Sequence, residues 1–518
     1  MPLHSIGFIA LFLPLSVLLY FVLGKTGHGR VALAWLIGTS LWFAGWRAFF
    51  DAELLLFSIV ANFLFGLTIH RCSQKHGIIR TVLLTGGVFM NLGALAYFKY
   101  STFILENLNL AGDTVSSFVA SSLPLGISFL TFQQIAYLVD VSRGRVTTFR
   151  FLEYCVFCSF FPKLLAGPIT RYEEFAPQIV KAMHSLSTLA FAEGVTLFAI
   201  GLTKKVLLAD TLAGYANPIF AADSSGRQLG MVEAWGGIFA YSFQLYFDFS
   251  GYTDMALGVA RLFGFTLPQN FNSPYKATNI IDFWQRWHMT LSRFLRDYLY
   301  IPLGGNRKGV FRQQVHIFIT MMLCGLWHGA NWTFVIWGAL HGLYLLINHG
   351  WRRLGMHCSP MMGWMVTFLS TAMAWVWFRA ESIPAATRIT ASLLGINGFW
   401  AQGFRDTLHH LEKPAAQFHS VAQFFSLDDM RIAFSFDRWT VYPVNVLFSE
   451  PVLHTFWLAV SGIVALRLPN TREWMTTEHQ SLEASLTMRR AVLIGALLFM
   501  VLLASMTSHP GGFIYENF

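Results

Sequence analysis

Charge-free runs of apolar residues, repeated along the whole chain, leave few folds open to this protein. The longest run, 313–351, contains no Asp, Glu, Lys or Arg and is long enough for two membrane-crossing helices. Shorter runs lie at 7–24, 31–46, 54–69, 81–98, 114–139, 194–203, 234–247, 354–378, 389–404, 451–466 and 491–515. We predict an all-α, polytopic membrane protein with about 11 to 13 membrane helices.

The composition supports the same fold class. Charged residues make up 12% of the 518 residues and hydrophobic residues 55%, whereas a soluble protein carries about 25% charged residues. The net charge of +9 comes from short basic clusters between the apolar runs, which is typical of cytoplasmic membrane loops. We therefore expect contacts with membrane lipids and no nucleic acid partner.

The signs of the loop charges predict how the chain crosses the membrane. Basic residues gather in the loops 25–30, 70–80 and 141–150, whereas the loop 99–113 carries both signs. Lys and Arg close to membrane helices stay on the cytoplasmic side. The N-terminus should therefore lie outside, and so should the stretch 401–450, which carries four basic and six acidic residues.

A histidine interrupts an apolar helix face in the segment Asn279–Tyr300. If this segment is one continuous helix, four charged residues share one side of it: Asp282, Arg286, Arg293 and Asp297. His288 then lies on the opposite, apolar side together with Trp284. A buried ionisable group is a functional candidate, although a core histidine bonded to a backbone carbonyl remains an alternative.

A second histidine lies inside the longest charge-free run, in the sequence CGLWHGANW at Cys324–Trp332. His328 is flanked by Gly325 and Gly329, a GxxxG spacing that lets another helix approach closely. An imidazole, with an ordinary pKa of about 6.5, can take a proton at neutral pH and suits general-base work. A histidine that merely bridges two packed helices is the alternative. Asn331 should lie one turn further on the same side.

The segment 276–312 carries seven basic and two acidic residues. This bias is an orientation signal, a landing site for a phosphorylated cytoplasmic donor, or both. Its basic pair, Arg307 and Lys308, follows two adjacent glycines that are typical of a turn; we expect the pair to bind the donor. Metal-binding spacings such as HxxxH or HExxH do not occur around the two histidines, so we predict no metal.

Five segments together resemble one known family, the membrane-bound O-acyltransferase (MBOAT) family. They are LPLGISFLTFQQIAYLVDVSRG (Leu123–Gly144), FPKLLAGPITRY (Phe161–Tyr172), LYFDFSGYTDMA (Leu245–Ala256), the segment Phe271–Arg307 and CGLWHGANWTFVIWGALHG (Cys324–Gly342). The sequence is most similar to the bacterial branch that O-acetylates alginate and other exopolysaccharides. The resemblance ends near residue 395 and implies an all-helical fold with a central tunnel.

The resemblance also implies a division of the chain and a set of site residues. It predicts an MBOAT membrane core at 1–395. The loop charges and apolar runs predict an outward-facing loop or peripheral helical region at 396–450 and C-terminal membrane helices at 451–518. The resemblance implies that His328 is the catalytic histidine and that His288 is the second polar position of the site. We expect Trp327 and Asn331 beside His328, and Trp284 beside His288, to contact substrate.

The implied chemistry is transfer of an acetyl group. A cytoplasmic thioester, with acetyl-CoA as the expected donor and no permanently bound cofactor, would meet a hydroxyl that His328 deprotonates. His288 would orient this base or polarise the thioester carbonyl. The resemblance implies a bacterial inner-membrane location and partners that include a periplasmic SGNH-type acetyltransferase and other polysaccharide acetylation and secretion proteins. Together with the loop charges, this location predicts a periplasmic N-terminus.

Two other functions remain open at this point. The protein could be a conduit that carries the acetyl donor without making or breaking bonds. It could also be an MBOAT enzyme with a different cargo or acceptor, such as D-alanine on a teichoic-acid-like polymer, a protein or a lipid. For the leading interpretation, alginate and cellulose are the two polymers that we expect first.

Overall fold

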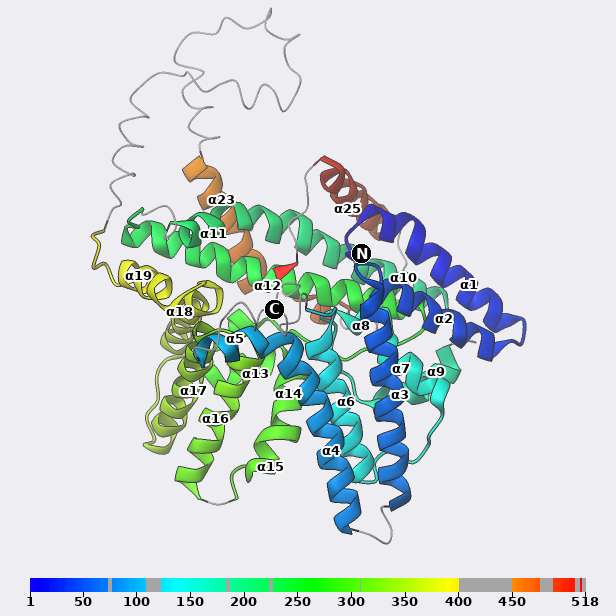
Figure 1. The fold of residues 1–518 in the computed structure, drawn as a ribbon. Coiled ribbons are helices and arrows are strands. Elements are labelled where there is room, and N and C mark those ends of the chain that lie inside the picture. The colour runs from blue at the N-terminus through cyan, green and yellow to red at the C-terminus, as the bar shows by residue number, and fades with distance from the viewer. Residues whose placement is uncertain are drawn as a thin grey trace, which may run out of the picture.

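The computed structural model describes residues 1–72, 77–108, 123–182, 187–222, 227–307, 309–399, 450–475, 488–507 and 513–514. Within these ranges every regular element is a helix, as the apolar runs predict (Figure 1). The first part of the chain contains α1 (Leu13–Lys25), α2 (Gly29–Ala44), α3 (Phe49–Cys72), α4 (Gly77–Leu95), α5 (Ser101–Asn107), α6 (Ile127–Ser142), α7 (Phe151–Ser159), α8 (Phe161–Leu164) and α9 (Tyr172–Ala182).

The remaining helices are α10 (Thr188–Thr203), α11 (Asp210–Ala221), α12 (Met231–Leu262), α13 (Ile280–Arg286), α14 (Met289–Leu295), α15 (Ile301–Leu303), α16 (Val310–His328), α17 (Trp332–Arg353), α18 (Pro360–Arg379), α19 (Ile383–Leu393), α23 (Glu450–Leu466) and α25 (Met488–Thr507). They include the longest one, α12, which packs against α10, α11 and α18. A 3-10 turn occupies Pro274–Lys276, and π-helical turns occupy Phe8–Phe12, Ala96–Tyr100, Lys204–Ala209 and Arg296–Tyr300.

Several helical segments are long and apolar enough to cross a membrane. In the described part of the chain these are Phe8–Lys25, Phe49–Cys72, Gly77–Asn107 and Pro360–Arg379. Shorter apolar helices occupy Gly29–Ala44, Leu453–Leu466 and Val492–Ser505. A charge-free run therefore marks a helix at each of these positions, while the total of 11 to 13 membrane helices stays a prediction.

Helix α12 is 32 residues long, and most of its side chains are buried. It packs against α10 through two pairs of glycines. A Cβ added to Gly201 would lie 2.5 Å from the carbonyl oxygen of Gly251, and one added to Gly258 would lie 2.6 Å from that of Gly194. Only glycine lets two helix backbones approach this closely, and the paired positions make the two helices antiparallel.

The long charge-free run folds into the predicted pair of helices, α16 and α17. They form an antiparallel hairpin in which the backbones touch at glycines on both sides. A Cβ added to Gly325 would lie 2.1 Å from the carbonyl oxygen of Phe334, and one on Gly338 would lie 2.3 Å from that of Met321. The close helix approach predicted from the GxxxG spacing is thus confirmed, and α17 is the partner.

The prediction of one continuous helix over 279–300 is wrong. The segment breaks after Arg286, because Trp287 is extended and His288 has φ +43° and ψ +53°, in the left-handed region. Two short helices, α13 and α14, flank the break. The regular spacing of the charged residues concealed it, since that spacing also fits an uninterrupted helix.

The loop charges predict that the helix ends lie on two sides of a membrane, and this orientation stays a prediction. The facing ends of α3 and α4, the end of α15 and the beginning of α16 lie in the lowest part of Figure 1, whereas the N-terminus and the beginning of α23 lie in its upper half. The predicted loop 99–113 begins too early, because helix continues to Asn107. Most of the predicted outward region 396–450 falls outside the described residues.

Candidate active site

His328 is the last residue of α16, deep in the protein, with a relative exposure of 2%. The helix ends here because Gly329 is extended, with φ −159° and ψ 149°. Asn331 then begins α17, and its side-chain oxygen accepts a hydrogen bond from the backbone N–H of Thr333 at 3.1 Å. The expectation that Asn331 follows His328 on the same helix is therefore wrong: it is the N-cap of the next helix.

Aromatic side chains surround the imidazole of His328. The ring centroids of Trp327, Trp337 and Phe378 lie 4.9, 5.2 and 5.2 Å from its own, each in an edge-to-face arrangement. These rings come from α16, α17 and α18, so three helices shape the site. Trp327 is thus beside His328 as predicted, and the aromatic surroundings keep bulk water from the ring.

Lys99 forms hydrogen bonds with the last carbonyls of α16, a role that we did not predict from the sequence. Its Nζ donates hydrogen bonds to the carbonyl oxygens of Trp327 at 2.6 Å and His328 at 3.2 Å, and to Ser128 Oγ at 3.2 Å. The last carbonyls of a helix have no partner within the helix and carry partial negative charge, so a cation suits them. The available signal was a lone charge within an apolar helical run.

His288 is fully buried at the break between α13 and α14. Its Nδ1 forms a 3.0 Å hydrogen bond with Oδ1 of Asn270, in the loop that follows α12. The ring of Phe249 meets the imidazole edge-to-face at 4.8 Å. The predicted inward orientation of His288 is therefore confirmed, although a helix break rather than a helix face produces it.

Trp327 lies between the two histidines. Its ring centroid is 4.9 Å from that of His328 and 6.4 Å from that of His288. Phe132 stacks on Trp327 at 4.8 Å, which fixes the indole plane. The structure therefore brings together the two histidines that the sequence marks 40 residues apart, with an aromatic ring as their common contact.

A third histidine belongs to the same cluster. His341, on α17, is fully buried, and its ring lies 4.8 Å from Trp337, which also contacts His328. Its Nδ1 accepts a 3.3 Å hydrogen bond from Nε1 of Trp284. His288, His341 and Lys99 all lie near enough to act electrostatically on His328. Trp284 thus contacts His341, a histidine that the sequence analysis did not include in the site.

Arg307, the described member of the predicted basic pair, does not reach the histidines. Arg307 lies in the exposed turn before α16, and Lys308 lies outside the described residues. Because His328 is at the far end of α16, the length of that helix, about 27 Å, separates it from Arg307. If Arg307 contacts a donor, it therefore contacts a part of the donor molecule that is distant from the reacting group.

Comparison with known proteins decides the family. The profile described as MBOAT, membrane-bound O-acyltransferase family, matches residues 88–382. The chain belongs to the membrane-bound O-acyltransferase family. The matched range contains Lys99, His288, His328 and His341. The protein is therefore a membrane-integral acyltransferase, and the resemblance found in the sequence is confirmed.

Curated relatives support the same family over most of their length. A protein named peptidoglycan O-acetyltransferase, from Helicobacter pylori, is 41% identical over 443 residues, which cover 79% of this chain and 82% of the relative. One named probable alginate O-acetylase AlgI, from Pseudomonas aeruginosa, is 41% identical over 404 residues, or 76% and 74%. A teichoic acid D-alanyltransferase from Streptococcus thermophilus is 32% identical over 238 residues, or 44% and 57%.

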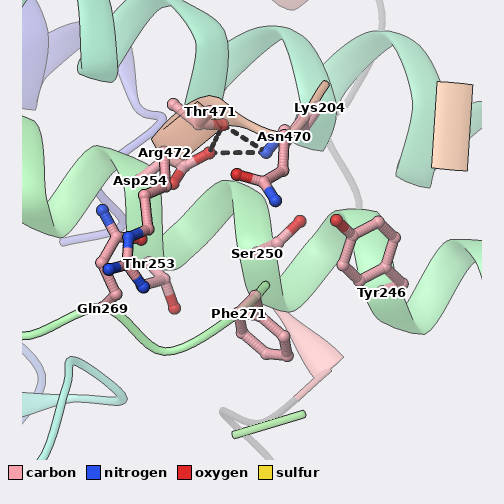
Figure 2. Close-up of a pocket in the computed structure, with 10 residues that line it drawn as sticks. All are labelled: Lys204, Tyr246, Ser250, Thr253, Asp254, Gln269, Phe271, Asn470, Thr471 and Arg472. Atoms are coloured by element: carbon pink, nitrogen blue, oxygen red, sulfur yellow. Dashed lines mark hydrogen bonds and ion pairs between the residues drawn. The ribbon is translucent and has the colours of Figure 1, made fainter. Parts of the chain in front are cut away.

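A polar pocket lies beside this MBOAT site (Figure 2). Lys204 Nζ forms an ion pair with Asp254 Oδ2 at 2.6 Å and donates to Thr471 Oγ1 at 2.8 Å. Gln269 and Phe271 form part of the wall. The sequence offered no sign of this pocket, because Thr471 meets Lys204 and Asp254 only through the fold.

Two aromatic rings separate the pocket from His288. Phe271 in the pocket wall packs edge-to-face on Phe249 at 5.0 Å, and Phe249 packs on His288 at 4.8 Å. Phe513, near the C-terminus, lies beside one of these rings, with its centroid 6.2 Å from that of Phe249. The loop 269–271 therefore has the pocket on one side and the histidine on the other. The tunnel implied by the resemblance stays a prediction.

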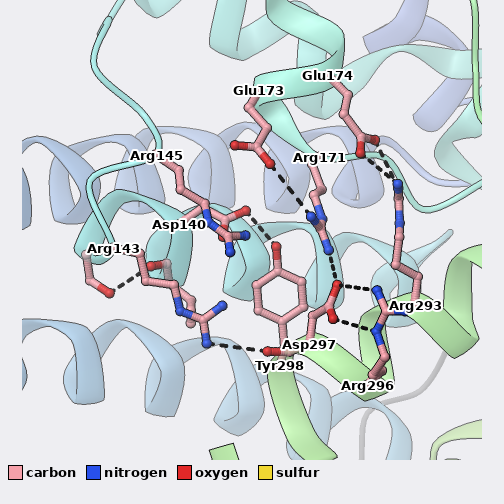
Figure 3. A network of polar contacts seen from close by, with 12 residues as sticks. Asp140, Arg143, Arg145, Arg171, Glu173, Glu174, Arg293, Arg296, Asp297 and Tyr298 are labelled. Atoms are coloured by element: carbon pink, nitrogen blue, oxygen red, sulfur yellow. Dashed lines mark hydrogen bonds and ion pairs between the residues drawn. The ribbon is translucent and has the colours of Figure 1, made fainter. Parts of the chain in front are cut away.

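A network of ion pairs and hydrogen bonds connects α14 and the turn that follows it to other helices (Figure 3). Arg293 forms a two-pronged pair with Glu174 of α9, at 2.7 and 2.9 Å. Asp297 pairs with Arg171, and Tyr298 donates to Asp140 of α6 at 2.6 Å. Arg293 and Asp297 of the charged stripe thus face other parts of the protein, which fixes the segment that follows His288.

Proposed function

We propose that this protein is an O-acetyltransferase that supplies acetyl groups to a polysaccharide outside the bacterial inner membrane. The observation that carries the proposal is a buried histidine, His328, at a helix end inside the charge-free run 313–351. The names of the two 41% identical relatives, one for peptidoglycan and one for alginate, support an acetyl cargo and a polysaccharide acceptor. Alginate or a related polymer is the expected acceptor; cellulose remains a prediction from the resemblance.

In this proposal His328 is the general base. The acceptor hydroxyl gives its proton to the imidazole, and the oxygen attacks the carbonyl carbon of an acetyl thioester. The tetrahedral adduct then expels the thiolate, which takes the proton back from the imidazolium. The aromatic rings around His328 keep out water that would otherwise hydrolyse the thioester.

The donor in this proposal is cytoplasmic acetyl-CoA, which enters from the side that carries the basic segment 276–312. The positive-inside rule supports that orientation, with the N-terminus in the periplasm. The acetyl group would then reach a periplasmic SGNH-type acetyltransferase or the polymer itself. The D-alanyltransferase relative matches a smaller part of the chain, which favours acetyl over D-alanine as cargo.

The experiment replaces His328 by Ala and measures acetyl groups on the secreted polymer at matched protein level. His349→Ala is the matched control, because this histidine lies on α17 of the same hairpin but is only half-buried. We expect acetylation to disappear with His328→Ala and to persist with His349→Ala. Normal acetyl content in the His328 variant would contradict the proposal and favour the conduit.

A further inference from the structure

Asn270 receives an unusual concentration of hydrogen bonds for a loop side chain. It is fully buried, and its Oδ1 meets His288 Nδ1 at 3.0 Å, Thr290 Oγ1 at 2.9 Å and the backbone nitrogen of Thr290 at 3.3 Å. Its own carbonyl oxygen accepts from the backbone N–H of Met289 at 2.9 Å. One residue thus bonds to three consecutive residues across the helix break.

These contacts determine which atom of Asn270 faces the histidine. A backbone N–H can only donate, so the side-chain atom that meets the nitrogen of Thr290 must be the amide oxygen. The oxygen can only accept, and therefore the Nδ1 of His288 must carry the hydrogen. In a neutral imidazole the other nitrogen, Nε2, is then a bare acceptor.

The Nε2 atom is buried, and within the described residues it has no hydrogen-bond partner. The rings packed around the imidazole are uncharged: Phe249 at 4.8 Å, Phe129 at 6.3 Å and Trp327 at 6.4 Å. His328 is a titratable group near enough to interact electrostatically with His288. A buried acceptor without a partner is a feature that normally requires an explanation.

The backbone around the break is held by the same loop. The N–H of Asn272 donates to the carbonyl of Arg286 at 3.0 Å, so the loop pairs with the chain on both sides of His288. The left-handed conformation of His288, at φ +43°, is uncommon for a residue other than glycine, although histidine adopts it more often than most residues. It persists only because surrounding contacts impose it.

We propose that Asn270 is a positioning residue that fixes the tautomer of His288, so that Nε2 can only accept a hydrogen bond during acetyl transfer. This inference rests on the function proposed above and narrows the role of His288. A neutral ring with this tautomer cannot polarise the thioester carbonyl, because that requires a donor at Nε2. It can accept from the attacking hydroxyl or from the N–H of a protonated His328.

The test compares two substitutions of Asn270 by the rate of acetyl transfer as a function of pH. Asn270→Leu removes every acceptor and should lower the rate about tenfold to a hundredfold, since the ring is no longer held in place. Asn270→Asp keeps an acceptor for all three donors and places a negative charge beside His288. That charge stabilises the protonated ring, so the acid side of the rate profile should move to higher pH by about one unit.

Asn272→Asp is the matched control. It adds the same charge two residues away, where the side chain is half-buried and accepts from Asn470 at 2.9 Å. We expect its pH profile to stay where it is in the unsubstituted protein. An unshifted profile with Asn270→Asp, or a full rate with Asn270→Leu, would overturn the inference.

The result is separable from the test of the proposed function. An essential His328 together with an unshifted Asn270→Asp profile removes only the positioning role. If Asn270→Asp failed to fold, this would also count against the inference, because Asp offers every acceptor that the inference requires. Thermal unfolding of each variant identifies that case.

Discussion

Replacing Gly325 by Ala should damage the site without touching any histidine. The added Cβ would lie 2.1 Å from the carbonyl oxygen of Phe334 and 3.1 Å from the Cα of Gly338, both in the backbone of α17. Backbone atoms cannot swing away as a side chain can. The two helices must therefore part by about 1 Å, and overpacking of this kind costs about 1–3 kcal/mol of stability.

The displacement acts directly on the proposed base. Gly325 lies one turn before His328, and Trp337, which contacts the imidazole at 5.2 Å, is next to Gly338 on the opposing helix. A shift of about 1 Å in a reacting group can reduce a rate about a hundredfold. We expect acetyl transfer to fall by that order, together with a lower midpoint of thermal unfolding.

Gly350→Ala is the control for the same hairpin. Gly350 is also helical, on α17, but nothing lies within 4 Å of the position its Cβ would take. Ala should be tolerated there, and it stabilises a helix by about 0.5–1 kcal/mol over Gly. Both variants are compared in detergent by thermal unfolding and in cells by acetyl content of the polymer. Equal behaviour of the two would refute the argument from close backbone contact.

Three further outcomes are expected. His288→Asn should retain more acetylation than His288→Gln or His288→Ala, because Asn keeps a side-chain N–H and tolerates the left-handed backbone; equal losses would contradict an orienting role. Lys99→Met should lower the midpoint of thermal unfolding, because it leaves the final carbonyls of α16 without a charged donor and costs about 1–3 kcal/mol of stability. Lys25→Met, at the exposed end of α1, should leave the midpoint unchanged. Neutralising Arg307 and Lys308 together should raise the KM for the donor more than it lowers kcat, because charges that hold the donor loosely bind ground and transition states alike. An unchanged KM would remove their role in donor binding.

Features that depend on neighbouring residues in the chain could be predicted from the sequence. The run 313–351 lacks charge over enough residues for two spans, and it folds into α16 and α17. His328 was identifiable because a titratable group in such a run stands out from its neighbours. The glycines beside it likewise indicated a close helix contact, and Gly325 makes one with α17.

Features whose cause is distant in the chain could not be predicted. The break at His288 is held by Asn270, 18 residues earlier, while the local charge spacing fits a continuous helix. Lys99 bonds to residues more than 220 positions away. His341 lies on a different helix from His328, and the hairpin brings the two histidines against the same ring, Trp337.

His288 and His328 both lie where a helix is interrupted, and this shared feature has a physical reason. A residue in the middle of a helix is covered on two sides by the neighbouring turns, whereas one at a helix end is open to partners from other segments. Interruption at membrane depth leaves backbone groups unbonded, which is tolerated only where protein groups replace the lost bonds. Lys99 supplies them at the end of α16, and Asn270 does so at the beginning of α14. The polar side chains that hold the two breaks are therefore as necessary to the geometry of the site as the histidines themselves.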